Sequence, residues 1–197
     1  DQSMPYEFDL DPALFPFYQS DLPVLLMGKG SSAIAEVPNF FDSTSAEDRF
    51  AAVLNSRGFA DGEQPYGLSN ASVDIVRISN PVLDNYSPFA TIDLGVAAVA
   101  PLKKMPLTSD GKTAAFFADG RVIIASIENA RVVSILSDPA VRIADITDAR
   151  IKGNTLYLSA GDSIRTYDIT DSAKPVVEKV ITAEGKVGSI CVDDDEI

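Results

Sequence analysis

The chain has 197 residues, of which 46% are hydrophobic and 23% charged, so it is long enough and apolar enough to bury a core. It carries 16 basic and 29 acidic residues, and the formal net charge of −13 makes nucleic acids and anionic membranes poor partners. Histidine is absent from the sequence, which excludes Ser-His-Asp, Cys-His and histidine-metal sites within this chain. No stretch reaches the roughly 18 apolar residues of a membrane span, so we expect no membrane insertion.

The N-terminal region, residues 1–71, differs in composition from the rest of the chain. Four prolines within its first 24 residues oppose both a helix and a regular sheet ladder, while the aromatic residues there are too many for a solvated tail. We expect an extended arm that lies on its own domain or on a neighbour, and the candidate partner-binding residues are Tyr6, Phe8, Phe15, Phe17 and Tyr18. Because the chain begins with Asp1 and shows no signal sequence, we expect a processed product or an excised piece of a longer protein.

Short strands and one short helix are expected in the rest of this region. The runs VLLM (24–27) and SAIAEV (32–37) have the composition of strands. A helix is predicted over about residues 45–57, because Thr44 and Glu47 have the spacing of a capping box and Phe50, Val53 and Leu54 recur at helical spacing.

From residue 72 to residue 197 the sequence is a series of short β-branched runs separated by Gly, Asp, Asn or Pro, which is typical of strands. Two passes of this series share an order: a turn, a strand, a tight hairpin turn, a second strand, a break and a third strand. The hairpin pairs Asp119-Gly120 and Gly161-Asp162 lie 42 positions apart, and such pairs tolerate the positive φ that tight turns need.

Each pass is preceded by a further expected strand, in residues 96–107 and 141–151, so that each unit holds four antiparallel strands. A period of about 42 residues with four strands predicts β-propeller blades. The expected blades are residues 95–140 and 141–187. A partial blade covers 72–94, with its first half in the N-terminal region, and a further blade starts at 188–197. The fold class is therefore all-β, with blades that make up only part of a closed ring; we expect a longer propeller, or blades supplied by another chain.

The stretch Tyr167-Asp168-Ile169-Thr170-Asp171, followed by Pro175, resembles the bacterial LVIVD propeller repeat, and SDGKTAAFFADGRVIIASI (109–127) is similar to the YVTN repeat. The resemblance covers about residues 72–197 and leaves out the N-terminal region. It implies a surface or periplasmic β-propeller and implies little about activity.

Candidate chemistry in the sequence is sparse. Asp193, Asp194 and Asp195 could hold a calcium ion, with a solvated acidic turn as the alternative. Asp168 and Asp171 are interpreted as local turn formers, and Cys191, in the apolar run GSICV, as a buried hydrophobic residue. No cofactor and no catalytic residue is assigned.

These observations predict an extracellular or periplasmic β-propeller that acts as a non-catalytic interaction module, with a protein or further copies of itself as partner. One alternative is a propeller enzyme of the lactonase or quinoprotein kind with a calcium ion in its central funnel. The other is a structural subunit of a surface filament or layer.

Overall fold

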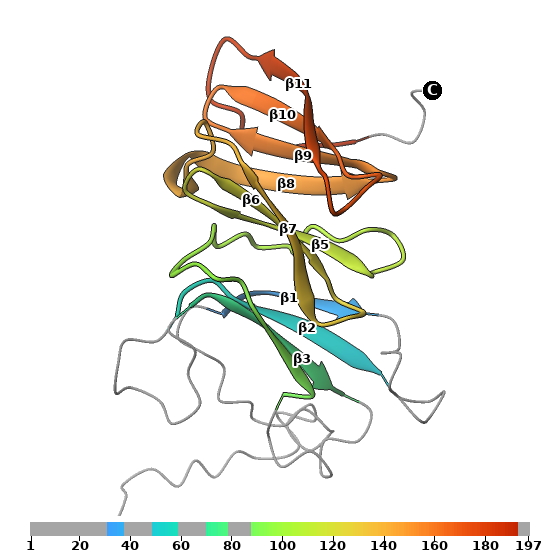
Figure 1. Ribbon diagram of the computed structural model, residues 1–197. Helices are drawn as coiled ribbons and strands as arrows, with labels where there is room; N and C mark the ends of the chain where they lie inside the picture. The colour runs from blue at the N-terminus through green and yellow to red at the C-terminus, as the bar shows by residue number, and fades with distance from the viewer. Residues whose placement is uncertain (1–30, 38–48, 59–69, 79–87, 193–197) are drawn as a thin grey trace, which may run out of the picture.

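A computed structural model describes residues 31–37, 49–58, 70–78 and 88–192 of the chain, and these form three antiparallel sheets stacked on one another (Figure 1). Sheet 1 contains β1 (Ser31–Val37), β2 (Phe50–Asn55), β3 (Ser72–Arg77) and β4 (Ala90–Asp93). Sheet 2 contains β5 (Thr113–Ala118), β6 (Arg121–Ser126) and β7 (Arg131–Ser137). Sheet 3 contains β8 (Ile146–Lys152), β9 (Thr155–Ala160), β10 (Ser163–Asp168) and β11 (Val176–Thr182). The all-β class expected from the sequence is confirmed for these residues.

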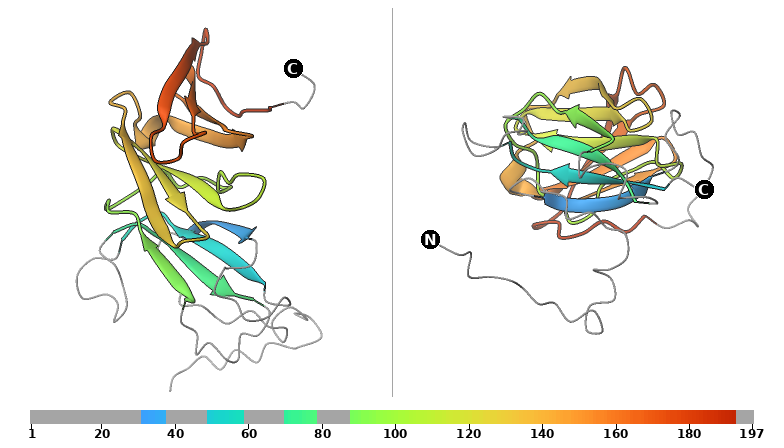
Figure 2. Two further views of the ribbon diagram at one scale, coloured as in Figure 1. Left: turned by 45° about the vertical axis from the view of Figure 1, so that its right-hand side comes forward. Right: turned by 90° about the horizontal axis from the view of Figure 1, so that it is seen from below.

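Each sheet is a meander in which sequential strands pair with one another. The order is β1-β2-β3-β4 in sheet 1, β5-β6-β7 in sheet 2 and β8-β9-β10-β11 in sheet 3. The first sheet therefore draws strands from both sides of the boundary expected at residues 71 and 72. Figure 2 shows the same succession of sheets from a second direction, with sheet 2 between the other two.

The two predicted hairpins are present with their expected turn residues. Ala118 pairs with Arg121, and Ala160 pairs with Ser163, so each turn has two residues. Gly120 and Gly161 have φ of 71° and 65°, a region in which a Cβ atom is strained. The hairpins β5-β6 and β9-β10 thus repeat at the spacing that the sequence indicated.

Strands β5 and β6 of the middle sheet are buried on both faces, while the outer strand β7 is half-buried or exposed. Successive side chains of a strand point to opposite faces, and β5 places Phe116 in a cluster with sheet 1 and Phe117 in a cluster with sheet 3. Phe116 is 2% exposed and Phe117 is 1% exposed. The two clusters form the core between neighbouring sheets.

The helix predicted at about residues 45–57 is wrong over its described part, because Phe50–Asn55 is strand β2. Residues 45–48 lie outside the described residues. Every residue of β2 is buried, since the strand pairs with β1 and β3 and is covered on both faces. A strand buried on both faces loses its alternation of polar and apolar residues, so a short apolar run of this kind resembles a buried helix in sequence.

The expected first strand of blade 95–140, within residues 96–107, is also wrong, since this stretch makes only isolated bridges, at Ala98 and Leu107. Pro101 and Pro106 lack the N–H group that a ladder requires. The segment still runs beside β5, because Ala100 N donates to the Phe117 carbonyl at 2.8 Å and Ala115 N donates to the Pro106 carbonyl at 3.1 Å. It occupies the place of a first strand without its regular pairing.

Residues 189–192, expected as the first strand of a further unit, form no strand, and residues 193–197 lie outside the described part. The backbone N–H of Ile190 donates to the Asp148 carboxylate at 3.1 Å instead of to a neighbouring strand. Cys191 is exposed, so its interpretation as a buried residue is wrong.

Across the described ranges, no helix combines the length and the apolar character needed to cross a membrane.

Candidate inter-sheet binding pocket

A pocket of about 430 Å³ lies where the first-strand edges of sheets 2 and 3 meet. One wall is the segment Ala100–Lys104, which runs beside β5. The facing wall is formed by the 3-10 helix Ile143–Asp145 and by β8, and Ser189 completes the lining. Pro101 has no N–H to give to a ladder, and Leu102 N donates to the Ala100 carbonyl at 2.9 Å, so the segment turns here and does not continue as a strand.

Basic side chains outnumber acidic ones in this lining. Lys103, Lys104 and Arg150 contribute three positive charges, and Asp148 contributes the one negative charge. Within the described part of the chain, neither lysine has a carboxylate partner, and both are exposed. The pocket is locally positive although the chain as a whole has a net charge of −13, and a positive lining favours an anionic ligand.

Asp148 is held by contacts within the protein. Its Oδ2 accepts from Arg150 Nη2 at 3.4 Å and from the Ile190 backbone N–H at 3.1 Å, while its Oδ1 accepts from the Ala149 N–H at 2.9 Å. The Asp148 side chain is 15% exposed and that of Arg150 is 38% exposed. The carboxylate therefore positions Arg150 and the C-terminal segment, and leaves the lysines free to meet a ligand.

The C-terminal wall of the pocket is fixed to β8 by hydroxyl contacts. Thr147 Oγ1 donates to the Val187 carbonyl at 2.7 Å, and Ser159 Oγ lies 3.2 Å from the same carbonyl. Val187 N donates in turn to the Gly161 carbonyl at 2.9 Å. These bonds keep residues 187–190 against sheet 3 without a strand.

Apolar side chains complete the surface that a ligand would meet. Leu102 is buried at 7% exposure, and Ile143 and Ile146 are half-buried. Ligand sites usually combine such an apolar wall with a few charged groups that fix orientation. This lining suits a molecule with one anionic end and one hydrocarbon or aromatic end.

The site residues predicted from the sequence do not belong to this pocket. The aromatic arm (Tyr6, Phe8, Phe15, Phe17, Tyr18) and the calcium candidates (Asp193, Asp194, Asp195) lie outside the described residues. Where the structure is described, His, Cys, Asp and Glu side chains form no group of three that could hold a metal ion. Sequence reasoning missed Lys103, Lys104 and Arg150, and the adjacent lysines beside Pro101 were the one local signal for them.

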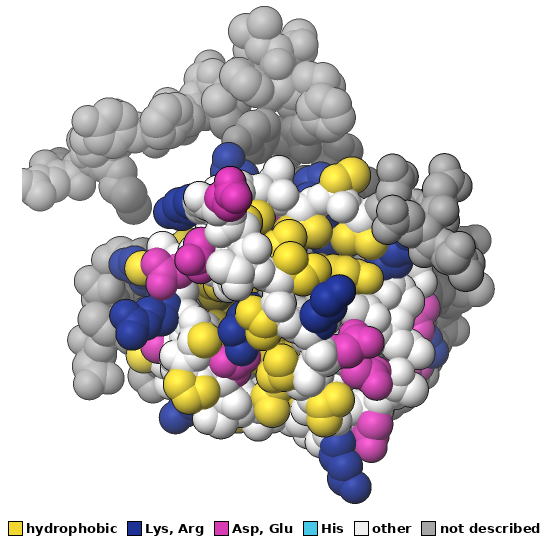
Figure 3. All heavy atoms as spheres, turned by 90° about the horizontal axis from the view of Figure 1, so that it is seen from above, with side chains coloured by type: hydrophobic (Ala, Val, Ile, Leu, Met, Phe, Trp, Pro, Cys, Tyr) yellow, Lys and Arg dark blue, Asp and Glu magenta, His cyan; other side chains and the backbone are white. Residues whose placement is uncertain are grey.

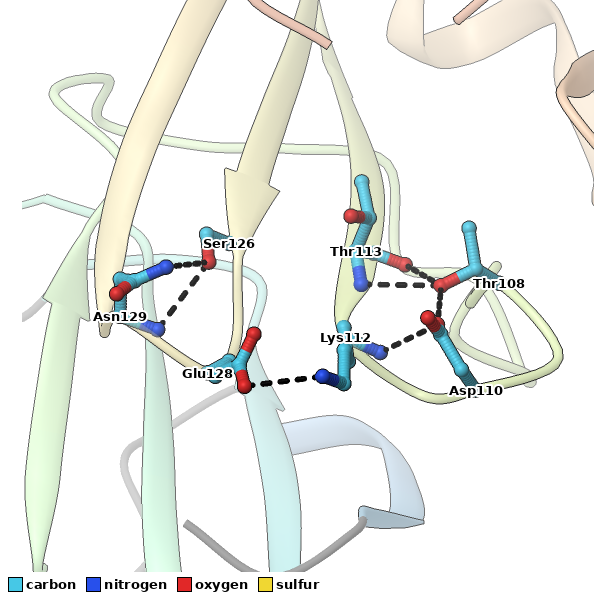
Figure 4. A network of polar contacts seen from close by, with 7 residues as sticks. All are labelled: Thr108, Asp110, Lys112, Thr113, Ser126, Glu128 and Asn129. Atoms are coloured by element: carbon cyan, nitrogen blue, oxygen red, sulfur yellow. Dashed lines mark hydrogen bonds and ion pairs between the residues drawn. The ribbon is translucent and has the colours of Figure 1, made fainter. Parts of the chain in front are cut away.

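A second polar cluster joins two turns of sheet 2 (Figure 4). Asp110 Oδ1 accepts from Thr108 Oγ1 at 2.6 Å and from the Lys112 backbone N–H at 3.0 Å. Lys112 Nζ reaches Glu128 Oε1 at 3.0 Å. The polar side chains shown in Figure 4 hydrogen-bond to one another or to the backbone, so this network stabilises the turn before β5.

Asp110→Asn is expected to destabilise the protein by about 0.5–1 kcal/mol, because an exposed carboxylate that accepts two hydrogen bonds contributes modestly. The hydrogen bonds from Thr108 and Lys112 lower the pKa of Asp110. Because the pKa of this carboxyl is lower in the folded than in the unfolded protein, its ionised form stabilises the fold at pH values above the unfolded pKa of about 3.9. This stabilisation is lost as the pH falls through the pKa of the folded protein. Urea melts of the wild type and of Asp110→Asn at pH 6 and pH 3 should therefore show that the difference between their free energies of unfolding is smaller at pH 3. A difference that is the same at both pH values would contradict the role given to the Asp110 carboxylate.

Asp168 and Asp171 form local turns, as predicted. Asp168 Oδ1 accepts from the Thr170 N–H at 2.8 Å, and Asp171 Oδ1 accepts from the Ala173 N–H at 3.0 Å. The Thr170 contacts lower the pKa of Asp168. These bonds start the link between β10 and β11.

Comparison with known proteins gives a distant structural likeness only. No family model matches the sequence, and no curated protein matches it. The chain is similar to apo AztD from Citrobacter koseri, with a TM-score of 0.46 and 14% identity over 80% of this chain and 48% of that one. A second AztD structure from the same organism gives a TM-score of 0.41 and 12% identity over 72% and 46% of the two chains. The chain spans about half the length of these solved chains.

Proposed function

We propose that the three stacked sheets are blades of a secreted or periplasmic β-propeller, and that this chain acts as a non-catalytic binding module. Support for the fold comes from the meander order of each sheet, the 42-residue spacing of the hairpins and the burial of β5 and β6 on both faces. Support for the compartment comes from the resemblance of residues 72–197 to surface and periplasmic propeller repeats.

The observation that carries the binding role is the positive pocket between sheets 2 and 3. We propose that it binds a small organic carboxylate, with the carboxylate near Lys103, Lys104 and Arg150 and the apolar body against Leu102 and Ile146. Each exposed ion pair contributes about 0.2–1 kcal/mol. Burial of an aromatic ring adds to this at ~25 cal/mol per Å², while the loss of translational and rotational freedom opposes it, so a benzoate-sized probe is expected to bind with a Kd on the order of 1–10 mM.

Titration of the protein with benzoate, followed by amide chemical shifts, should show saturable changes at residues 100–104 and 146–150. Benzamide, which has the same ring without the charge, should bind at least about five-fold more weakly. The variant K103Q/K104Q should weaken benzoate binding by about 5- to 10-fold, since two of the three cations are removed.

A matched control is R131Q/K174Q, which makes the same charge change at two exposed positions toward the opposite edges of sheets 2 and 3. It should leave the benzoate affinity within about two-fold, because charges beyond the Debye length of about 8 Å are screened. Equal binding of benzoate and benzamide, or an equal loss in both lysine variants, would count against the pocket as a carboxylate site.

A further inference from the structure

Strand β11 is the outer edge of sheet 3 and is unusual in its exposed apolar side chains. It pairs with β10 alone among the strands of the described residues. Four of the six large hydrophobic residues found exposed in the described part lie on it: Val176 at 54%, Val177 at 42%, Val180 at 46% and Ile181 at 44%. Figure 3 looks down on the end of the molecule formed by sheet 3 and shows hydrophobic side chains exposed between basic and acidic ones. An edge of this kind is a template for pairing with another strand.

The sequence of β11 is complementary to its own antiparallel copy. It reads Val176-Val177-Glu178-Lys179-Val180-Ile181. When two copies are paired about a two-fold axis between Glu178 and Lys179, each glutamate lies opposite the lysine of the other copy. Valine then lies opposite valine or isoleucine at every remaining position, and such cross-strand pairs stabilise a sheet.

A β-bulge makes this pairing geometrically consistent. Residues that pair across an antiparallel ladder share a face, so opposed residues of the two copies must lie on the same face. Val176 and Ile181 are five positions apart and would lie on opposite faces of a regular strand. In the register with β10 they pair with Asp168 and Ile164, which are four positions apart and share a face. The extra residue at Glu178 produces this shift.

The inner pairs obey the same condition. Val177 pairs with Tyr167 and Val180 pairs with Arg165, two positions apart on β10, so both valines share the other face. Glu178 Oε2 lies 3.5 Å from Thr166 Oγ1, and Lys179 pairs with Thr166, so both charged residues lie on the Thr166 face. The strand therefore has a symmetric order of faces about its centre.

We propose that β11 pairs with β11 of a second copy, joining the two copies of sheet 3 into one continuous sheet across a two-fold axis. Opposite charges at the centre set the register, and the flanking valine and isoleucine side chains contact their cross-strand partners on each face of the joined sheet. The isologous interface closes after two copies, so it produces a dimer and not a filament. This inference is independent of the proposed pocket, which lies at the other edge of sheet 3.

Charge exchange at the centre of β11 tests the proposal by sedimentation equilibrium. The wild-type chain should show a concentration-dependent dimer. Glu178→Lys puts lysine opposite lysine twice in each dimer, and Lys179→Glu does the same with glutamate, so each single variant should weaken dimerisation by roughly 10-fold or more. The double variant E178K/K179E restores both opposite pairs and should return the dimer constant to within about three-fold of the wild type.

The matched control exchanges exposed charges outside the strand, with Glu184→Lys and Lys186→Glu, and should leave dimerisation unchanged. In a Cys191→Ser background, V177C/V180C should form a disulfide-linked dimer on oxidation, because the two positions are opposed across the axis. A monomer at all concentrations would overturn the proposal. So would a double exchange that fails to restore the dimer, or the absence of the cross-link.

Discussion

Asp138→Ala is expected to destabilise the protein by about 2–4 kcal/mol, because it removes the carboxylate that pairs with the half-buried Arg165. Asp138 follows β7 and joins sheet 2 to β10 of sheet 3: its carboxylate accepts from Arg165 Nε at 3.0 Å and from Arg165 Nη2 at 3.1 Å. Tyr167 Oη donates to the same carboxylate at 3.0 Å. The side chains of Asp138 and Arg165 are 5% and 14% exposed.

The tyrosine stays neutral in this network and serves as a donor. Burial, together with the Asp138 carboxylate, raises the pKa of Tyr167 well above its ordinary value, although the Arg165 contact opposes this. Removing Asp138 therefore leaves the buried Tyr167 hydroxyl without its acceptor and leaves the half-buried Arg165 with only the Tyr167 oxygen, at 3.3 Å from its Nε. Polar groups that lose their partners in this way carry their desolvation cost.

Chemical denaturation followed by circular dichroism measures the effect. Glu184→Ala, at an exposed position, is the control and should cost under about 0.5 kcal/mol. The double variant Asp138→Ala/Arg165→Met should recover part of the loss, because it removes the uncompensated charge as well. A cost under about 1 kcal/mol for Asp138→Ala alone would show that the ion pair does not hold the two sheets together.

Phe117→Ala is expected to cost about 3–5 kcal/mol, since it opens a cavity in the core between sheets 2 and 3. For a chain of this size each kcal/mol lowers Tm by roughly 2–4 °C, so a drop of about 10 °C is expected in a thermal melt. Phe117 is 1% exposed and belongs to the cluster that includes Leu156 and Leu158.

Ile135→Ala is the matched control for this prediction. Ile135 lies on β7 of the same sheet but is 51% exposed, so its truncation should cost no more than about 1 kcal/mol. If both substitutions lowered the free energy of unfolding equally, the face of sheet 2 that carries Phe117 would not be covered by sheet 3.

The hairpins could be predicted from sequence because their determinants are local. Asp119-Gly120 and Gly161-Asp162 state the turn chemistry directly, and the runs TAAFFA and TLYLSA beside them are recognisable as strands. Strand β2 could not be recognised in the same way. Its sequence FAAVLN is buried on both faces, so it lacks the alternation of polar and apolar residues that indicates a strand.

The candidate site could not be predicted from local sequence patterns. Its walls come from residues 100–104, 143–150 and 189, which are brought together by the stacking of two sheets. The irregular path of the first wall follows from Pro101 and Pro106, which lack the N–H groups of a regular ladder although residues 96–107 otherwise have the composition of a strand. Asp138 and Arg165 are likewise 27 positions apart and carry no motif that links them.

Stacking of the sheets on both faces of sheet 2 is the claim on which the pocket and the predictions for Asp138 and Phe117 depend. Nuclear Overhauser contacts from the rings of Phe116 and Phe117 test it most directly, because these neighbours point to opposite faces of β5. The account predicts contacts from Phe116 to methyl groups of the sheet 1 cluster, such as Leu54 and Ile75, and from Phe117 to those of the sheet 3 cluster, such as Leu156 and Leu158. Rings that contact the same partners, or only their own sheet, would contradict it.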